Sequence, residues 1–303
     1  MRKFFLLFCL HFPLFFAKAQ IAPQDLNIIH AMQDSIKVFG DSMVNSRDEQ
    51  NRVVASYRII RCMKTALKVK NSFQYQFDSL LPMQVIEPPD HSFRIFTWFT
   101  VNDEQIYKYY GAIQLKSDTL KLFPLIDYSD FTDKPEDKTV DNQNWIGALY
   151  YSVIPVKSGK QVYYTLLGSD GNTSASNKKV ADVLWFTKNG QPRFGAPIFD
   201  TGKKGTQNRF YLEFSDEAWA TLRFDPQENK IVYDHVEPPS EAMEGFFPQY
   251  LPDGTYEGFE WKKGKWHHVD EIAYEKREAG DVPNVIKKES PKYQQPVTPP
   301  SKK

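Results

Sequence analysis

Adjacent histidine and carboxylate residues are the first candidates for acid–base or metal chemistry in this chain. They occur as Asp234-His235 and His267-His268, both in segments with the alternating pattern of a β-strand. Neighbouring residues of a strand point to opposite faces, so neither pair can serve one proton or one metal ion. Catalysis by His235 would need a distant partner such as Glu237 or Ser169. We therefore assign no catalytic residue, no metal ligand and no cofactor.

The run Gly168-Ser169-Asp170-Gly171 superficially resembles a nucleophile loop or a calcium loop. Its residue types are those of any tight turn. An EF-hand comparison that starts at Asp170 finds Ala175 instead of the required glycine and Ala181 instead of the bidentate glutamate. The chain also has no Gly-x-Ser-x-Gly, His-Glu-x-x-His, Walker or Gly-x-Gly-x-x-Gly motif. These absences favour a non-catalytic function.

Aromatic residues are the most distinctive feature, at 15% of the 303 residues with six tryptophans. Alternation along strands places about half of such side chains in a core. The other half can form an exposed face that stacks on a sugar or packs on a protein. We assign Trp261, Trp266, Tyr256 and His267 to this face. Core packing of a twisted sheet is the competing explanation.

Two functional classes follow from these features. The first is an exported, non-catalytic envelope or secreted factor that binds a glycan or an envelope protein through an aromatic-rich β surface. The alternative is a carbohydrate- or cell-wall-acting hydrolase, in which paired carboxylates such as Asp234 or Glu237 meet only in the fold. Equal numbers of basic and acidic residues, 38 each, argue against a nucleic-acid partner.

The N-terminus has the pattern of a signal peptide over residues 1–19. Arg2 and Lys3 precede the apolar run Phe4–Phe16, and Ala17-Lys18-Ala19 supplies the small residues of a cleavage site before Gln20. The apolar run is too short to span a bilayer, so we expect no membrane span after cleavage. We predict an exported protein, periplasmic or secreted. Only Cys62 would remain, which excludes an intramolecular disulfide and leaves it as a small buried hydrophobe.

Residues 20–70 predict a helical hairpin. Apolar residues recur at three and four positions through Ile29, Ile36 and Met43, and again from Val53. Between the two patterns, Ser46-Arg47-Asp48-Glu49 reads as a capping box with Ser46 as the N-cap.

Residues 71–278 predict an antiparallel β domain, so the fold class is mainly β within α+β. About a dozen short strands alternate with turns, and Asn189-Gly190 is the strongest hairpin signal among them. So long a meander must form a barrel, a sandwich or a propeller-like arrangement. The acidic segment 127–144 is a surface loop or an internal boundary. The tail 279–303, with five prolines and five lysines, is predicted to be disordered.

Several strand segments resemble a group of exported, functionally uncharacterised proteins of Bacteroidota. The similar runs are Tyr163–Gly168, Asp182-Val183-Leu184, Arg193–Phe199 and Ile231–Val236. The resemblance covers most of the β region and implies no activity. It does imply O-glycosylation at Asp-(Ser/Thr)-aliphatic sites, which here are centred on Ser35, Ser42, Ser79 and Thr119.

Overall fold

The computed structural model describes residues 20–77, 80, 82–202 and 205–273. The predicted signal peptide and the predicted C-terminal tail lie outside these residues. Within the described part, no helix combines the length and the apolar character needed to cross a membrane.

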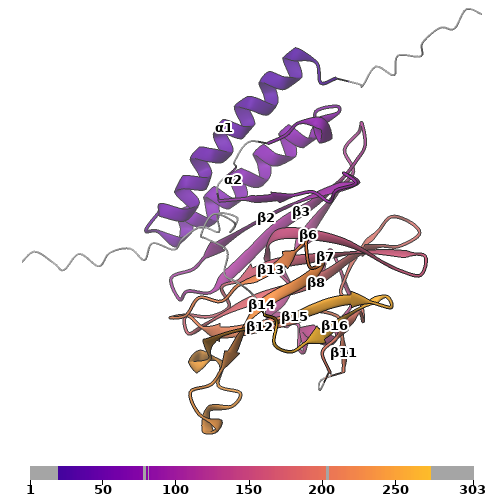
Figure 1. The fold of residues 1–303 in the computed structure, drawn as a ribbon. Helices are drawn as coiled ribbons and strands as arrows, with labels where there is room; N and C mark the ends of the chain where they lie inside the picture. The colour runs from indigo at the N-terminus through magenta and orange to yellow at the C-terminus, as the bar shows by residue number, and fades with distance from the viewer. Residues whose placement is uncertain (1–19, 78–79, 81, 203–204, 274–303) are drawn as a thin grey trace, which may run out of the picture.

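Two long helices open the described chain and lie side by side (Figure 1). Helix α1 spans Pro23–Asn45 and helix α2 spans Glu49–Lys68, so the short connection makes them antiparallel, as predicted. Asp48 is the N-cap of α2, because its carboxylate accepts a hydrogen bond from the Gln50 amide at 2.8 Å. Ser46 instead is the C-cap of α1, so the predicted capping box is wrong. A charged cap one residue before the first turn also interacts favourably with the helix dipole.

The remaining chain forms three sheets, which we call the helix-side, middle and outer sheets. The helix-side sheet has the order β1 (Gln84–Ile86), β2 (Phe93–Val101), β3 (Tyr107–Leu115), β4 (Leu122–Ile126). The middle sheet has the order β5 (Val140–Asp141), β9 (Pro192–Phe194), β8 (Ser176–Phe186), β7 (Gln161–Asp170), β6 (Leu149–Ser158), and β12 (Phe210–Ser215) also pairs with β8. The outer sheet has the order β11 (Thr206–Gln207), β10 (Phe199–Asp200), β16 (Lys265–Val269), β15 (Leu251–Lys262), β14 (Lys230–Glu237), β13 (Leu222–Asp225).

The strands pair antiparallel, as expected from the short turns between them. Among the strands of the described residues, β10 and β16 are the exception and run parallel. The predicted Asn189-Gly190 turn joins β8 to β9, and Gly190 has a positive φ of 72°, which glycine adopts readily. The segment 127–144 carries the chain from the helix-side sheet to the middle sheet.

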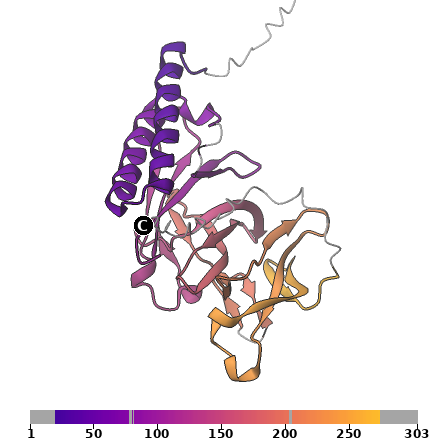
Figure 2. The ribbon, with the colours of Figure 1, turned by 90° about the vertical axis from the view of Figure 1, so that its left-hand side faces the viewer.

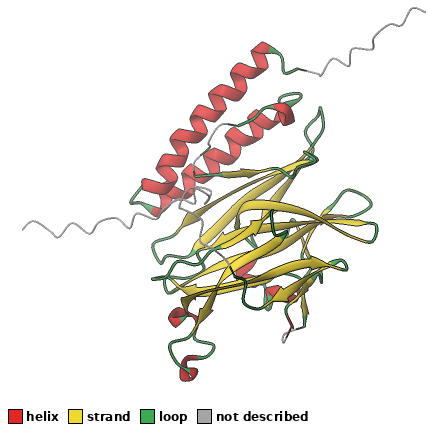
Figure 3. Cartoon of the chain, viewed as in Figure 1, coloured by secondary structure: helices red, strands yellow, loops and turns green. Residues whose placement is uncertain are grey.

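Side-chain alternation explains how the layers stack. On β2, Phe96 and Trp98 pack against the helices, whereas Phe93 and Ile95 pack on the middle sheet. The middle sheet alternates in the same way, since its strands contribute to two separate core clusters, one on each side. The order is therefore helices, helix-side sheet, middle sheet and outer sheet (Figures 2 and 3). Of the three arrangements that the sequence left open, this stack is closest to a sandwich.

Cys62 lies half-buried against the cluster between the helices and the helix-side sheet. Burial raises the pKa of its thiol. This environment suits the predicted role as a small hydrophobe.

Candidate functional site

The structure corrects the assignment of Trp266 to an exposed aromatic face. Trp266 is fully buried between the outer and middle sheets, and its indole N–H donates to Thr165 Oγ1 at 2.9 Å. On β16 the alternation turns this residue toward the middle sheet, where a large apolar ring stabilises the core. Trp266 is therefore a structural residue and offers nothing to an external ligand.

The other three predicted binding residues do not share a face. Trp261 lies opposite Trp266 in the β15–β16 pairing and packs on it, with ring centroids 5.2 Å apart. Tyr256 and His267 occupy alternate positions on the same strands, so they point away from the middle sheet. His267 Nδ1 is 3.0 Å from Asp200 Oδ2. No single surface combines the four residues.

Neither Glu237 nor Ser169, the partners that catalysis by His235 would need, is among the described contacts of Asp234 or His235. Asp234 accepts hydrogen bonds from the backbone and the hydroxyl of Thr221, each at 2.6 Å. His235 instead faces Asp253 and Glu257 from the neighbouring strand β15. These partners are far away in sequence, so adjacency along the chain could not have revealed them.

Exposed aromatic and methionine side chains gather on a loop between β14 and β15. Residues 238–250 project from the outer sheet as the orange segment at the bottom of Figures 1 and 2. The seven residues 241–247 are all exposed, among them Met243 at 41%, Phe246 at 51% and Phe247 at 38%. Leu251 follows at 48%. We call residues 238–251 the apolar loop.

The apolar loop has a defined conformation. Two short 3-10 turns, Glu241–Met243 and Phe247–Gln249, shape it. The Tyr250 hydroxyl accepts from the Gly245 amide at 2.9 Å, and the Tyr250 carbonyl accepts from the Ser215 amide of β12 at 3.0 Å. The Phe247 and Tyr250 rings are 5.0 Å apart. These contacts hold the apolar side chains outward instead of letting them fold onto the sheet.

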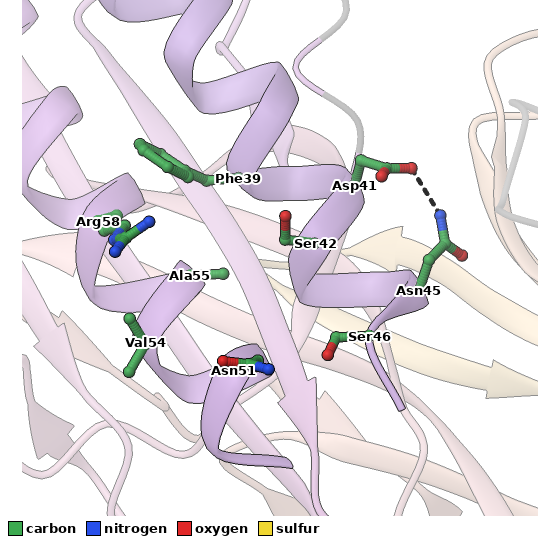
Figure 4. A pocket seen from close by; sticks show the side chains of 9 residues that line it. All are labelled: Phe39, Asp41, Ser42, Asn45, Ser46, Asn51, Val54, Ala55 and Arg58. Carbon is green, nitrogen blue, oxygen red and sulfur yellow. Dashed lines mark hydrogen bonds between the residues drawn. The ribbon is translucent and has the colours of Figure 1, made fainter. Parts of the chain in front are cut away.

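A groove of about 390 Å³ lies between the two helices (Figure 4). Asp41 is its single carboxylate, and Asn45 donates to that carboxylate at 2.7 Å. The Arg58 guanidinium lies over the Phe39 ring at 5.3 Å, so it occupies the aromatic face on which a sugar could stack. The groove therefore lacks both the carboxylate pair of a glycosidase and a free aromatic platform.

A second pocket of about 240 Å³ lies between α2 and the ends of β2 and β3. It contains two carboxylates, Glu49 and Asp130. Glu49 accepts from the Asp103 amide at 2.9 Å, and Asp130 lies 3.9 Å from Lys108 Nζ. Both groups thus have structural partners, and neither Asp234 nor Glu237 lines either pocket.

One buried cation lies beneath an exposed ring. Lys179 of β8 is buried, and its Nζ is 5.0 Å from the centroid of Trp219, which is 57% exposed. Burial lowers the pKa of Lys179 to about 8, although Asp234 opposes this shift.

The predicted glycosylation positions differ in their surroundings. Ser35 and Ser42 lie within α1 and donate to the carbonyls of Ala31 and Val38. Thr119 is exposed in the turn between β3 and β4. Ser79 lies outside the described residues. Of the three positions that the structure describes, Thr119 is the one outside a helix.

Sequence reasoning missed the apolar loop. Its signal was the adjacent pair Phe246-Phe247 within a segment of Pro, Gly, Ser and Glu, where buried strands are not expected. Searches for related proteins found no matching family model, no similar curated protein and no similar solved structure.

Proposed function

We propose that this protein is an exported, non-catalytic factor that binds a protein partner through the apolar loop. The carrying observation is that Met243, Phe246 and Phe247 are exposed together on a loop with a defined conformation. Exposing such side chains to water is unfavourable, and three of them within five residues of one loop favour an interaction site. Met and Phe are also among the residues enriched at protein interfaces.

The chemistry of the loop favours a protein over a glycan. Met243, Phe246 and Phe247 are wholly apolar side chains, which suit an apolar pocket of a protein better than the hydroxyl-covered surface of a sugar. Glu241 and Glu244 border the patch and are exposed. The partner that fits is an apolar pocket with basic residues at its rim.

The hydrolase alternative receives less support. A glycosidase needs two carboxylates facing each other across a cleft. The first pocket has a single carboxylate, and those of the second pocket are hydrogen-bonded or ion-paired to neighbouring groups. Export remains a prediction that rests on the N-terminal pattern.

Crosslinking with the double variant Phe246→Ser/Phe247→Ser tests this proposal. The wild-type protein, added to an envelope fraction of its source cells, should crosslink to a defined partner identified by quantitative mass spectrometry. The double variant should reduce that crosslink at least about tenfold, because removing paired aromatic anchors costs several kcal/mol at an interface. Its melting temperature should stay unchanged, since both side chains are exposed.

Phe131→Ser is the matched control. Phe131 is 71% exposed on a different loop and stacks only on Tyr128 among its described ring contacts. It should leave the crosslink intact. Equal capture by the wild type and the double variant would rule out the apolar loop as the binding surface. Sedimentation at rising concentration tests whether the partner is a second copy of the chain. A dimer that forms in the wild type and is lost in the double variant would identify it.

A further inference from the structure

Imidazole and carboxylate groups alternate across three neighbouring strands of the outer sheet. The participants, which we call the histidine–carboxylate cluster, are His235 of β14, Asp253 and Glu257 of β15, and His268 and Asp270 at the end of β16. His235 and His268 cannot share a site with their sequence neighbours, which point to the opposite face, but here both have carboxylate partners on adjacent strands.

Strand pairing explains why these residues meet. Tyr233 pairs with Glu257, and Phe259 pairs with His268, so all four side chains lie on the face that the outer sheet turns toward the middle sheet. Apolar rings fill the part of this face that packs on the middle sheet. The polar groups of the cluster lie beyond these rings, at the edge of the core. A bulge between Asp234 and Val236 shifts the register at His235 and brings it to Asp253.

The cluster is centred on Glu257. Its Oε2 atom is 3.1 Å from His268 Nε2, and its Oε1 atom is 3.7 Å from His235 Nε2. Each imidazole has a second carboxylate behind it: His268 Nδ1 is 3.4 Å from Asp270 Oδ1, and His235 Nδ1 is 2.9 Å from Asp253 Oδ2. For His235 this is the arrangement in which a carboxylate orients an imidazole, whereas Asp270 stands beside His268 as a further oxygen donor.

The charges in the cluster do not balance when the imidazoles are neutral. Asp253, Glu257 and Asp270 carry three negative charges, and within the described ranges no lysine or arginine forms an ion pair with them. The Tyr233 hydroxyl donates to Glu257 at 2.9 Å, which adds a hydrogen bond but no positive charge. A bound divalent cation would supply the positive charge that neutral imidazoles do not.

The surroundings would strengthen cation binding. The His268 ring packs against Phe259 at 5.7 Å and Tyr233 at 6.5 Å, which gives one side of the cluster an apolar wall. After Asp270 the backbone turns at Glu271, with φ 48°, and the Ile272 amide donates to the Tyr256 carbonyl at 2.7 Å. This turn fixes the segment that carries Asp270 beside Glu257.

We propose that Glu257, His268 and Asp270 bind a divalent transition metal, with Zn²⁺ as the reference ion. Each residue offers one ligand atom, and the three atoms lie within 4.8 Å of one another. Ligands about 2.0–2.2 Å from a tetrahedral metal are about 3.3 Å apart, so binding requires a contraction of about 1.5 Å at most. His235, backed by Asp253, is a positioning residue that holds the second oxygen of Glu257.

The donor set also indicates the class of metal. One imidazole and two carboxylates suit Zn²⁺, whereas Ca²⁺ requires six to eight oxygen ligands. Two carboxylates and a neutral imidazole would balance the dication. Three protein ligands leave a coordination position open to water or to a group of another molecule.

Metal titration of the purified, chelator-treated chain tests the site. Isothermal titration with Zn²⁺ should give one site per chain, and Co²⁺ should produce visible absorption bands of tetrahedral or five-coordinate geometry. His268→Gln and Glu257→Gln should each weaken Zn²⁺ binding at least about tenfold and remove the Co²⁺ bands, because each deletes a ligand.

His267→Gln is the matched control. His267 is the next residue along the strand and also contacts a carboxylate, Asp200, but it lies on the other face of the sheet. It should keep wild-type affinity and Co²⁺ bands. Circular dichroism confirms folding of each variant, and a Zn²⁺-dependent rise in melting temperature, present in wild type and His267→Gln only, gives a second readout.

Three results would overturn the proposal. The first is a wild-type chain that binds no Zn²⁺ at micromolar concentrations, which would leave the cluster as imidazolium–carboxylate ion pairs. The second is equal weakening of binding by His267→Gln. The third is retention of the Co²⁺ bands in both Glu257→Gln and His268→Gln.

Discussion

Arg209 Nε lies 3.0 Å from Asp182 Oδ1, and both side chains are buried in the middle sheet. Tyr150 donates its hydroxyl to the other carboxylate oxygen at 3.0 Å, and Arg209 also donates to the carbonyls of Pro135 and Lys138. The pair thereby fastens the segment 127–144 to strands β8 and β12. Removing one partner of a buried ion pair leaves an uncompensated charge, which is the costly way to break it.

Asp182→Asn should lower the free energy of unfolding by about 3–5 kcal/mol, because Arg209 would keep its buried charge without a counter-ion. Urea denaturation of both proteins measures the difference. The matched control is Glu228→Gln, which breaks the exposed ion pair with Lys230 and should cost less than about 1 kcal/mol. Equal effects of the two substitutions would show that the Asp182 contact adds nothing through burial.

Lys179→Met should stabilise the protein at pH 7 by about 2–3 kcal/mol, because a buried ammonium is replaced by an apolar chain of similar length. The folded-state pKa of Lys179, about 8, lies below the unfolded value of about 10.4. The burial cost is therefore complete below pH 8 and disappears as the pH rises toward 10.4.

The advantage of Lys179→Met should accordingly shrink between pH 8 and pH 10. Denaturation curves of the wild type and Lys179→Met across this range give the difference in free energy of unfolding. The other titrating groups are the same in both proteins, so their contributions cancel. Lys178→Met is the control, since Lys178 is half-exposed and lies 3.5 Å from Glu213. A stability difference that stays constant with pH would contradict the lowered pKa of Lys179.

Trp266→Ala should cost about 3–5 kcal/mol, as expected for deleting a buried aromatic side chain that also donates a hydrogen bond. Trp219→Ala should cost about 1 kcal/mol or less, because its ring is exposed and its described cation contact is with Lys179. Thermal and urea unfolding measure both. A small effect at Trp266 would indicate that this ring does not fill the core.

N-terminal mass spectrometry of the exported protein should find Gln20 as the first residue. The reason is the Ala-x-Ala site that follows the apolar run Phe4–Phe16. A protein that keeps Met1 would refute the predicted cleavage.

Glycosylation at the exposed turn is checked by comparing the intact mass of the wild type with that of Thr119→Ala.

The parts of the fold that local patterns determine could be predicted from the sequence. The helical hairpin follows from its period, and the β8–β9 hairpin follows from Asn189-Gly190, because both depend on residues close together in the chain. The stacking of three sheets depends on which face each strand buries against a distant strand. Local periodicity carries no information on that choice.

The same limit explains the errors about the candidate site. Trp266 lies beside the polar His267 and His268, so local alternation does not reveal its burial, and its contact Thr165 lies in another sheet. His235 and His268 were separated from partners because neighbours in a strand diverge, whereas strand pairing brings them both to Glu257. The proximity of these residues depends on the strand register, including the bulge at His235.

The hydrogen bond from Trp266 to Thr165 also constrains the order of folding. Thr165 lies about a hundred residues before its partner in the chain, and the parallel pairing of β10 with β16 needs the same late segment. The helices and the helix-side sheet can assemble first, but one apolar face of the middle sheet stays uncovered until β16 has been delivered and has paired. That interval is when a chaperone that holds extended strands apart would matter most to this chain.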